Sequence, residues 1–221
     1  MKAYRRSTAI EPFRKFCRAL DLLILLNALR RRERLPGFSG LRRMTFLEMG
    51  PGPMRLAAFK RKLFRQVYFL DMADFGVPDP HLVLVNLESC GSVQAILECL
   101  PPEARSGPVL LFADHCLEHL STKVVRGLFE SIAEHGVAAC FRVPNVHSPT
   151  GQRNYQADPT HRTPFDEEFR RDAERTGFAV FPWIRWYRPG IYGRTLRGSQ
   201  PVMSLAEEIV LSHRPARDAG A

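Results

Sequence analysis

The chain has 221 residues, of which 45% are hydrophobic and 25% are charged, a composition typical of a globular protein and not of a disordered or fibrous one. Its five cysteines are dispersed and include no C-x-x-C pair, which argues against a disulfide framework and a cysteine-based zinc site and fits a reducing cytoplasm. The formal net charge of +9 makes an acidic partner conceivable, so the place of that charge in the chain matters.

The excess positive charge lies wholly in residues 1–44. This segment carries twelve Lys and Arg against three acidic residues, whereas residues 45–221 carry twenty charges of each sign. We therefore expect a basic amino-terminal arm and linker over 1–44, a main domain over 45–213 and a short tail over 214–221.

Within the arm, residues 13–29 predict a helix with one apolar face, and Pro36-Gly37 predicts a linker over 30–41. The densest apolar run, 22–26, is too short to span a bilayer. Three interpretations remain open: the helix docks on the main domain, it contacts acidic lipid headgroups at a membrane surface, or it binds nucleic acid. Nucleic acid is disfavoured because no aromatic residues are interleaved with the basic ones and the main domain is not basic.

After the arm, short apolar strands alternate with helical patterns, which is typical of a mostly parallel sheet with helices on both faces. We expect helices at 54–64, 92–100, 121–134 and 165–176. Strands are expected near 45–49, 67–71, 82–86, 108–113, 137–143, 178–183 and 208–213. Only ten residues, including two prolines, separate the second strand from the third, so an irregular loop is expected there.

The end of the first strand carries a glycine turn, Glu48-Met49-Gly50-Pro51-Gly52, and the second strand ends in Asp71, nineteen residues after Gly52. A Rossmann-type sheet holds a nucleotide-like cofactor with such a unit. Its glycines let the backbone approach the ligand, the following helix presents its amino terminus, and the carboxylate accepts hydrogen bonds from ribose hydroxyls. A tight turn without a ligand is the alternative.

Five ordered motifs resemble class I S-adenosylmethionine-dependent methyltransferases, in particular type-11-like members associated with polysaccharide or glycolipid assembly. The motifs are FLEMGPG (46–52), LDM (70–72), LLFADHCLEHL (110–120), FRVPN (141–145) and DPTHRTPFDEEFRRDAERTGF (158–178). The resemblance covers about residues 45–213. It implies an α/β fold, a Rossmann-like three-layer sandwich with a mostly parallel seven-stranded sheet whose last strand is antiparallel.

The same resemblance implies S-adenosyl-L-methionine as the cofactor and a cytoplasmic enzyme that methylates a hydroxyl of a sugar or glycolipid-type acceptor. The residues implied for the cofactor are Glu48, Gly50 and Gly52 at the methionine end and ribose, Asp71 at the ribose diol, Asn86 and Leu87 beside the adenine, and Asp114, which with His115 closes the site. Pro51, the adjacent Pro53 and the absence of a third glycine depart from the family pattern. A catalytically degenerate binding or scaffold protein is therefore the alternative.

Two histidine clusters lie beyond the glycine turn. Residues 115–119 have the H-x-x-E-H spacing of the inverted zinc-protease signature, but no third ligand is placed by the sequence, so no metal is expected. In the second cluster, His161 is expected to take the acceptor's proton and Asp158 to orient it. His115, near a strand end, is the other catalytic candidate. Loops pinned by local hydrogen bonds are the alternative for both clusters.

Aromatic and basic residues alternate over 183–197, from Trp183 and Arg185 to Tyr192 and Arg197. Stacking faces beside guanidinium groups suit a sugar, an anionic headgroup or a base. A hairpin packed against the arm explains the pattern equally well.

Overall fold

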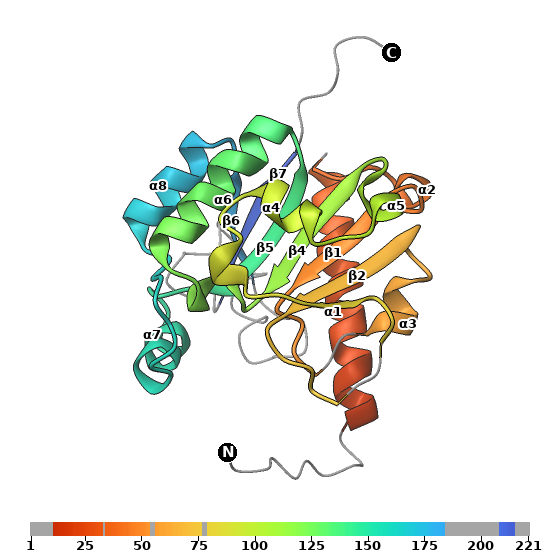
Figure 1. Cartoon of the computed structure of the whole chain (residues 1–221). Helices are drawn as coiled ribbons and strands as arrows, with labels where there is room; N and C mark the ends of the chain where they lie inside the picture. The colour runs from red at the N-terminus through yellow and green to blue at the C-terminus, as the bar shows by residue number, and fades with distance from the viewer. Residues whose placement is uncertain (1–10, 33, 54–55, 77–78, 184–207, 215–221) are drawn as a thin grey trace.

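The computed structural model describes residues 11–32, 34–53, 56–76, 79–183 and 208–214. Its centre is a seven-stranded sheet in the order β3-β2-β1-β4-β5-β7-β6 (Figure 1). The strands are β1 (Thr45–Met49), β2 (Gln66–Asp71), β3 (Leu82–Leu84), β4 (Val109–Asp114), β5 (Ala138–Pro144), β6 (Ala179–Trp183) and β7 (Glu208–His213). Pairing is parallel from β3 to β5, and β7 is antiparallel to both β5 and β6. This confirms the predicted fold class.

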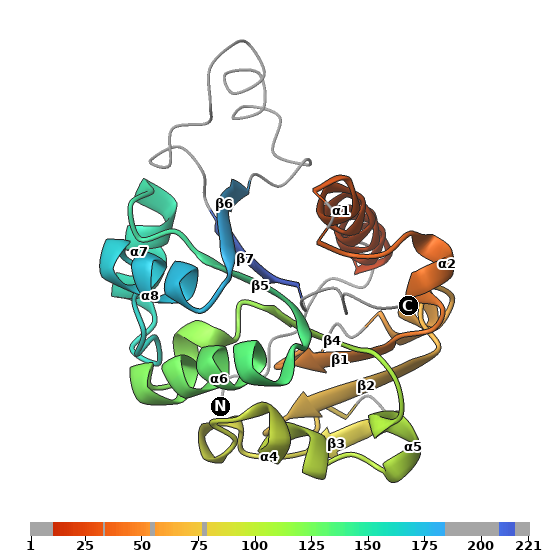
Figure 2. The same ribbon diagram turned by 90° about the horizontal axis from the view of Figure 1, so that it is seen from above.

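Helices cover both faces of the sheet (Figure 2). One layer contains α4 (Val93–Glu98), α5 (Pro102–Arg105), α6 (Thr122–His135) and α8 (Glu167–Arg175), and the other contains α1 (Glu11–Arg31), α2 (Phe38–Leu41) and α3 (Ala57–Lys60). The helix α7 (Pro149–Ala157) and the short 3-10 helices η1 (Leu87–Ser89) and η2 (Leu117–His119) lie in the connections. The chain therefore forms the three layers that the alternating pattern predicts.

Each strand divides its side chains between the two layers, because successive residues of a strand point to opposite faces. Leu47 and Met49 of β1 belong to the core cluster under α4, α6 and α8. Phe46 of the same strand packs with Phe112 of β4 in the second cluster, under α1. Position along β1 and β4 therefore decides which layer a polar side chain meets.

The helix of the basic arm, α1, packs in the second core cluster. Leu25, Leu26 and Leu29 are buried there against the sheet. This packing agrees with the docking interpretation of the arm. Near the amino end of α1, by contrast, Phe13 and Phe16 are 66% and 61% exposed. None of the helices in the described part of the chain has the length and apolar character needed to cross a membrane.

The segment expected as a linker connects α1 to β1 and contains α2, and its Leu35 and Leu41 are buried in the core cluster under α1. One prediction about the connections is wrong. In the described residues 56–64, the helix expected over 54–64 is the single turn α3. It begins after Leu56, which has φ +50, in the left-handed region that an α-helix cannot continue. The irregular loop between β2 and β3 is confirmed in its described residues, 72–76 and 79–81.

Candidate functional site

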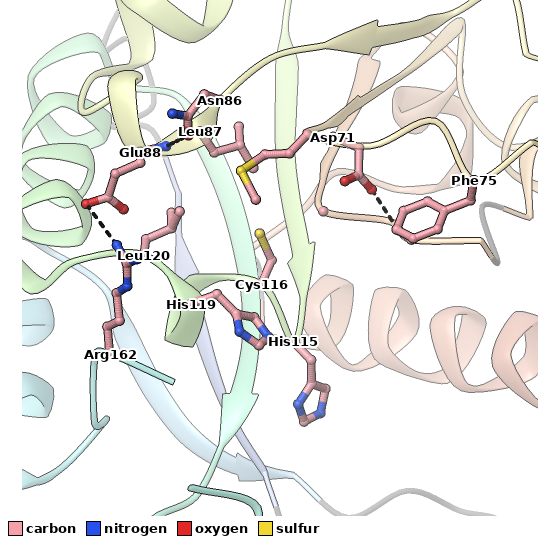
Figure 3. A pocket seen from close by; sticks show the side chains of 13 residues that line it. Asp71, Phe75, Asn86, Leu87, Glu88, His115, Cys116, His119, Leu120 and Arg162 are labelled. Carbon is pink, nitrogen blue, oxygen red and sulfur yellow. Dashed lines mark hydrogen bonds and ion pairs between the residues drawn. The ribbon is translucent and has the colours of Figure 1, made fainter. Parts of the chain in front are cut away.

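A cavity of about 480 Å³ opens at the carboxyl ends of β1, β2 and β4 (Figure 3). Of the predicted site residues, six line it: Gly50, Gly52, Asp71, Asn86, Leu87 and His115. The wall also contains residues that were not predicted there, namely Met72, Phe75, Glu88, Cys116, His119, Leu120 and Arg162. Ligands of open α/β sheets bind at this edge, so the cavity is the candidate site.

The glycine turn after β1 brings bare backbone to the cavity. Gly52 has φ +59, and a Cβ built on it would meet no other heavy atom within 4 Å. Its N–H donates to Asp71 Oδ2 at 3.0 Å, so the turn and the carboxylate are fixed to each other. Each carboxylate oxygen has two lone pairs, which leaves Asp71 able to accept further hydrogen bonds from a ligand. The two hydroxyls of a ribose diol can donate such hydrogen bonds.

Asn86 and Leu87 form another part of the wall, at the start of η1. The Asn86 side chain accepts a hydrogen bond from the Glu88 N–H at 3.1 Å, and Leu87 is buried in the core. Glu88 Oε2 in turn accepts from the Ser121 N–H at 3.0 Å, at the amino end of α6. Hydrogen bonds from Ser121 hold the pKa of Glu88 below its ordinary value. This wall is therefore fixed to α6 by a charged group.

Glu48, predicted to hold the cofactor's methionine end, is on the opposite face of β1 from Met49 and does not line the cavity. It is buried in an ion pair with Lys60 of α3, whose side chain is 2% exposed. Burial raises the pKa of Glu48 and lowers the pKa of Lys60, and the pairing opposes both shifts. The role predicted for Glu48 stays a prediction.

Asp114, the other predicted cofactor residue outside the cavity wall, is clamped by Arg142 of β5. The guanidinium donates from Nε to Asp114 Oδ1 at 2.8 Å and from Nη2 to Oδ2 at 2.5 Å. It also pairs with Asp21 of α1 and lies 3.4 Å from Glu208 of β7. Burial opposes the charge, but these carboxylates raise the pKa of Arg142 well above its ordinary value.

This buried charge network was missed, although two signals for it stand in the sequence. Arg142 interrupts an apolar strand, and Asp21 interrupts an apolar helix. Charged residues are rarely buried without a partner, so each of these two positions indicated a buried counter-charge.

His115 lines the cavity at the end of β4 with φ +57. Its Nδ1 lies 3.1 Å from Glu118 Oε1 and its Nε2 lies 2.8 Å from Glu208 Oε1. Burial lowers the pKa of His115, but the hydrogen bonds to the two carboxylates outweigh it and raise the pKa to about 9. An imidazolium has no lone pair to take a proton. The arrangement therefore suits a positioning residue, and the catalytic role of His115 stays a prediction.

Asp158 and His161, predicted as a catalytic pair, lie in the connection after α7 and do not line the cavity. His161 Nε2 is 3.7 Å from Asp158 Oδ2, beyond hydrogen-bond distance. Asp158 Oδ1 accepts instead from the Thr160 hydroxyl at 2.6 Å and the Thr160 N–H at 2.9 Å. Burial lowers the pKa of His161. Their catalytic roles stay predictions.

The third feature of the sequence, the alternating aromatic and basic stretch, lies almost wholly outside the described residues. Only Trp183 at its start is described, packed beside the core cluster under α1. The sugar-stacking surface expected over 184–197 stays a prediction.

Neither a family model nor a curated protein sequence matches the chain. Solved structures do match its fold. An S-adenosylmethionine-dependent methyltransferase from Archaeoglobus fulgidus superimposes with a TM-score of 0.53 at 16% identity, covering 86% of this chain and 93% of that chain. One from Clostridium acetobutylicum gives 0.54 at 9% identity, covering 90% of this chain and 92% of that chain. The chain therefore shares the Rossmann-like fold of these two proteins.

Proposed function

We propose that the protein transfers the methyl group of S-adenosyl-L-methionine to an acceptor hydroxyl. The observation that carries the proposal is the cavity at the carboxyl edge, where the Gly52 N–H and the Asp71 carboxylate are bonded at 3.0 Å. Five of the seven residues predicted for the cofactor line this cavity, in a fold shared with methyltransferases that use it.

The residues of the cavity fit the cofactor's parts. Asp71 would accept from the ribose hydroxyls, Leu87 would pack against the adenine, and the open backbone at Gly52 leaves room for the methionine part. The cavity volume of about 480 Å³ lies within the range of small-molecule sites. The bound cofactor supplies a methyl group on a sulfonium, and the protein's part is to align the acceptor with it.

The acceptor we propose is a sugar or glycolipid-type hydroxyl, met in the cytoplasm. The proposal rests on the sequence resemblance and on the polar groups that the cavity offers beside the cofactor residues. Arg162 and His119 line the wall, and the Arg162 side chain is largely exposed, 3.9 Å from Glu88. A guanidinium at this place suits an anionic or hydroxyl-rich acceptor.

A binding or scaffold protein without catalysis is the second candidate. It is favoured by the burial of Glu48 with Lys60, which removes from the cavity the carboxylate expected at the methionine end. The two candidates differ in turnover, since both would bind the cofactor.

A peripheral membrane contact is the partner that we propose for the amino end of α1. Phe13 and Phe16 are exposed there, beside the exposed Lys15, a combination that suits a headgroup boundary. In a flotation assay with anionic vesicles, the full chain should float and the Phe13→Ser/Phe16→Ser variant should not. Equal flotation of both would remove this proposal.

Methyl transfer is tested with methyl-labelled S-adenosylmethionine and a bacterial glycolipid and glycan extract. Wild type and the control Asp74→Ala, on the same loop but outside the cavity wall, should label an extract component. Asp71→Ala should not. Cofactor binding without label in any fraction would favour the scaffold candidate.

A further inference from the structure

Three side chains with metal-binding donor atoms come together beside the cavity, outside the set of residues assigned to the cofactor. Glu118 and His119 come from η2, and His161 comes from the connection after α7. Each offers one donor atom, and these atoms lie within 4.8 Å of one another. We propose that Glu118, His119 and His161 bind a divalent zinc ion. In the H-x-x-E-H signature both histidines are ligands, whereas here both ring nitrogens of His115 are bonded to Glu118 and Glu208, and His161 is the second histidine of the set.

Backbone hydrogen bonds hold the two segments of the cluster in register. The Glu118 carbonyl accepts from the Arg162 N–H at 2.7 Å and from the Thr163 N–H at 3.1 Å. The Thr163 hydroxyl donates to the Leu120 carbonyl at 2.7 Å. His161 is therefore fixed beside η2 by bonds that do not involve its ring, and the donors are brought together before any ion binds.

A chain of hydrogen bonds sets the tautomer of His119. The Thr160 hydroxyl donates to Asp158 Oδ1 at 2.6 Å, so its oxygen is an acceptor for His119 Nδ1 at 2.8 Å. His119 therefore carries its proton on Nδ1 and, when neutral, a free lone pair on Nε2. Histidines that bind metals are oriented in this way by a partner on the other ring nitrogen.

The other two side chains carry buried polar atoms without partners. Glu118 is fully buried, and in the described residues its Oε2 has no hydrogen-bond partner, nor has His161 Nδ1. An unpartnered buried carboxylate oxygen is unfavourable because the hydrogen bonds that it loses to water are not replaced, so such atoms need an explanation. A cation accounts for both atoms at once. His161 Nε2 remains 3.7 Å from Asp158 Oδ2, beyond hydrogen-bond distance.

The donor set suits zinc. Two imidazoles and one carboxylate are the ligands of zinc sites that keep a fourth position open for water or substrate. Bonds of about 2.0–2.1 Å place tetrahedral ligands roughly 3.3 Å apart, so the three donors must draw closer when the ion binds. His119 lines the cavity, so the ion would lie near the cavity wall. If the proposed function holds, the ion would polarise the acceptor hydroxyl there.

Zinc binding is measured without cofactor or acceptor, so its outcome is independent of methyl transfer. The full chain is stripped with a chelator, shown to be folded by circular dichroism, and titrated with zinc chloride in a calorimeter. We expect one ion per chain. His119→Ala should weaken binding at least about 100-fold, and Thr160→Val, which removes only the orienting hydroxyl, about 10–100-fold. The matched control His147→Ala, an exposed histidine outside the cluster, should bind like wild type.

Cobalt identifies the ligands, because five free cysteines are also present. The Co²⁺-loaded protein should show the visible bands of a tetrahedral nitrogen and oxygen site and no thiolate charge-transfer band. The absence of stoichiometric zinc in the wild type, unchanged affinity in both His119→Ala and Thr160→Val, or thiolate bands would each overturn the proposal.

Discussion

Two features of the end of β1 require a glycine at Gly50. Its φ of +60 lies in the left-handed region, and a Cβ built on it would stand 2.5 Å from Cys116 Sγ. The sequence pattern predicts a glycine here for the sake of a ligand. The structure adds the close contact with Cys116, which no spacing in the sequence could indicate because the two residues belong to different strand ends.

Gly50→Ala should therefore lower the free energy of unfolding by about 2–5 kcal/mol, combining left-handed strain with overpacking against Cys116. Urea denaturation measures the change. Cys116→Ala in the same chain should recover only part of the overpacking loss, because it removes Sγ but keeps the Cβ that would stand 2.8 Å from the added methyl group. A loss below about 0.5 kcal/mol in Gly50→Ala would contradict the described turn.

The spacing of residues along the chain predicts which residues line the cofactor cavity, but it does not predict how the charged groups around the cavity are paired. Gly52, Asp71 and Asn86 follow strand ends in sequence order, so the strand pattern places them at one edge. His115 is different, because one of its two carboxylate partners, Glu208, is 93 residues away in sequence. Its charged state depends on that pairing and is not readable from its own motif.

The link between α3 and β1 is a buried ion pair. Lys60 looks like a surface residue of a longer helix in the sequence, yet it is 2% exposed and paired with Glu48. The longer helix was predicted wrongly because the periodicity of apolar residues shows neither the left-handed backbone at Leu56 nor the burial of Lys60.

Lys60→Met should lower the free energy of unfolding by about 3–5 kcal/mol, since it leaves Glu48 buried without its counter-charge. The double variant Glu48→Gln/Lys60→Met should recover most of the loss. Lys62→Met, at a neighbouring exposed position, is the control and should change stability by less than about 0.5 kcal/mol. Equal denaturation midpoints for Lys60→Met and Lys62→Met would contradict the buried pair.

The link between η1 and α6 depends on a titrating group. The pKa of Glu88 is lowered in the folded protein by its bonds from Ser121, so its contribution is present above the unfolded pKa and is lost as pH falls through the folded one. At pH 7, Glu88→Gln should be less stable than wild type by about 1 kcal/mol. The difference should shrink as pH falls below about 4.3. Thermal melts at several pH values measure it, and a difference that grows toward acid would refute the assignment.

The whole molecule depends on α1 as a covering layer of the sheet. Charge composition indicates an arm, because the basic residues gather there, but the leucines of the same helix are buried with Phe46 and Phe112. Asp21 adds an ion pair to Arg142 on β5. The alternation of strands and helices was predictable from the hydrophobic pattern. The charge composition of the arm describes its solvent-exposed face and not its buried face, so the docking of α1 was only one of three interpretations.

Leu25→Ala should destabilise the full chain by about 2–5 kcal/mol, the usual cost of a cavity in a core. Leu23→Ala, at a half-buried position of the same helix, should cost clearly less. Guanidinium denaturation of the two variants compares them. Equal small losses would mean that α1 does not cover the sheet in solution.

The central claim, that the cavity at the carboxyl edge holds S-adenosylmethionine, is tested most directly by calorimetric titration of the full chain with S-adenosylhomocysteine. We expect saturable binding of one molecule per chain, lost in Asp71→Ala and retained in Asp74→Ala. No heat of binding and no thermal shift at millimolar ligand in folded wild type would contradict it.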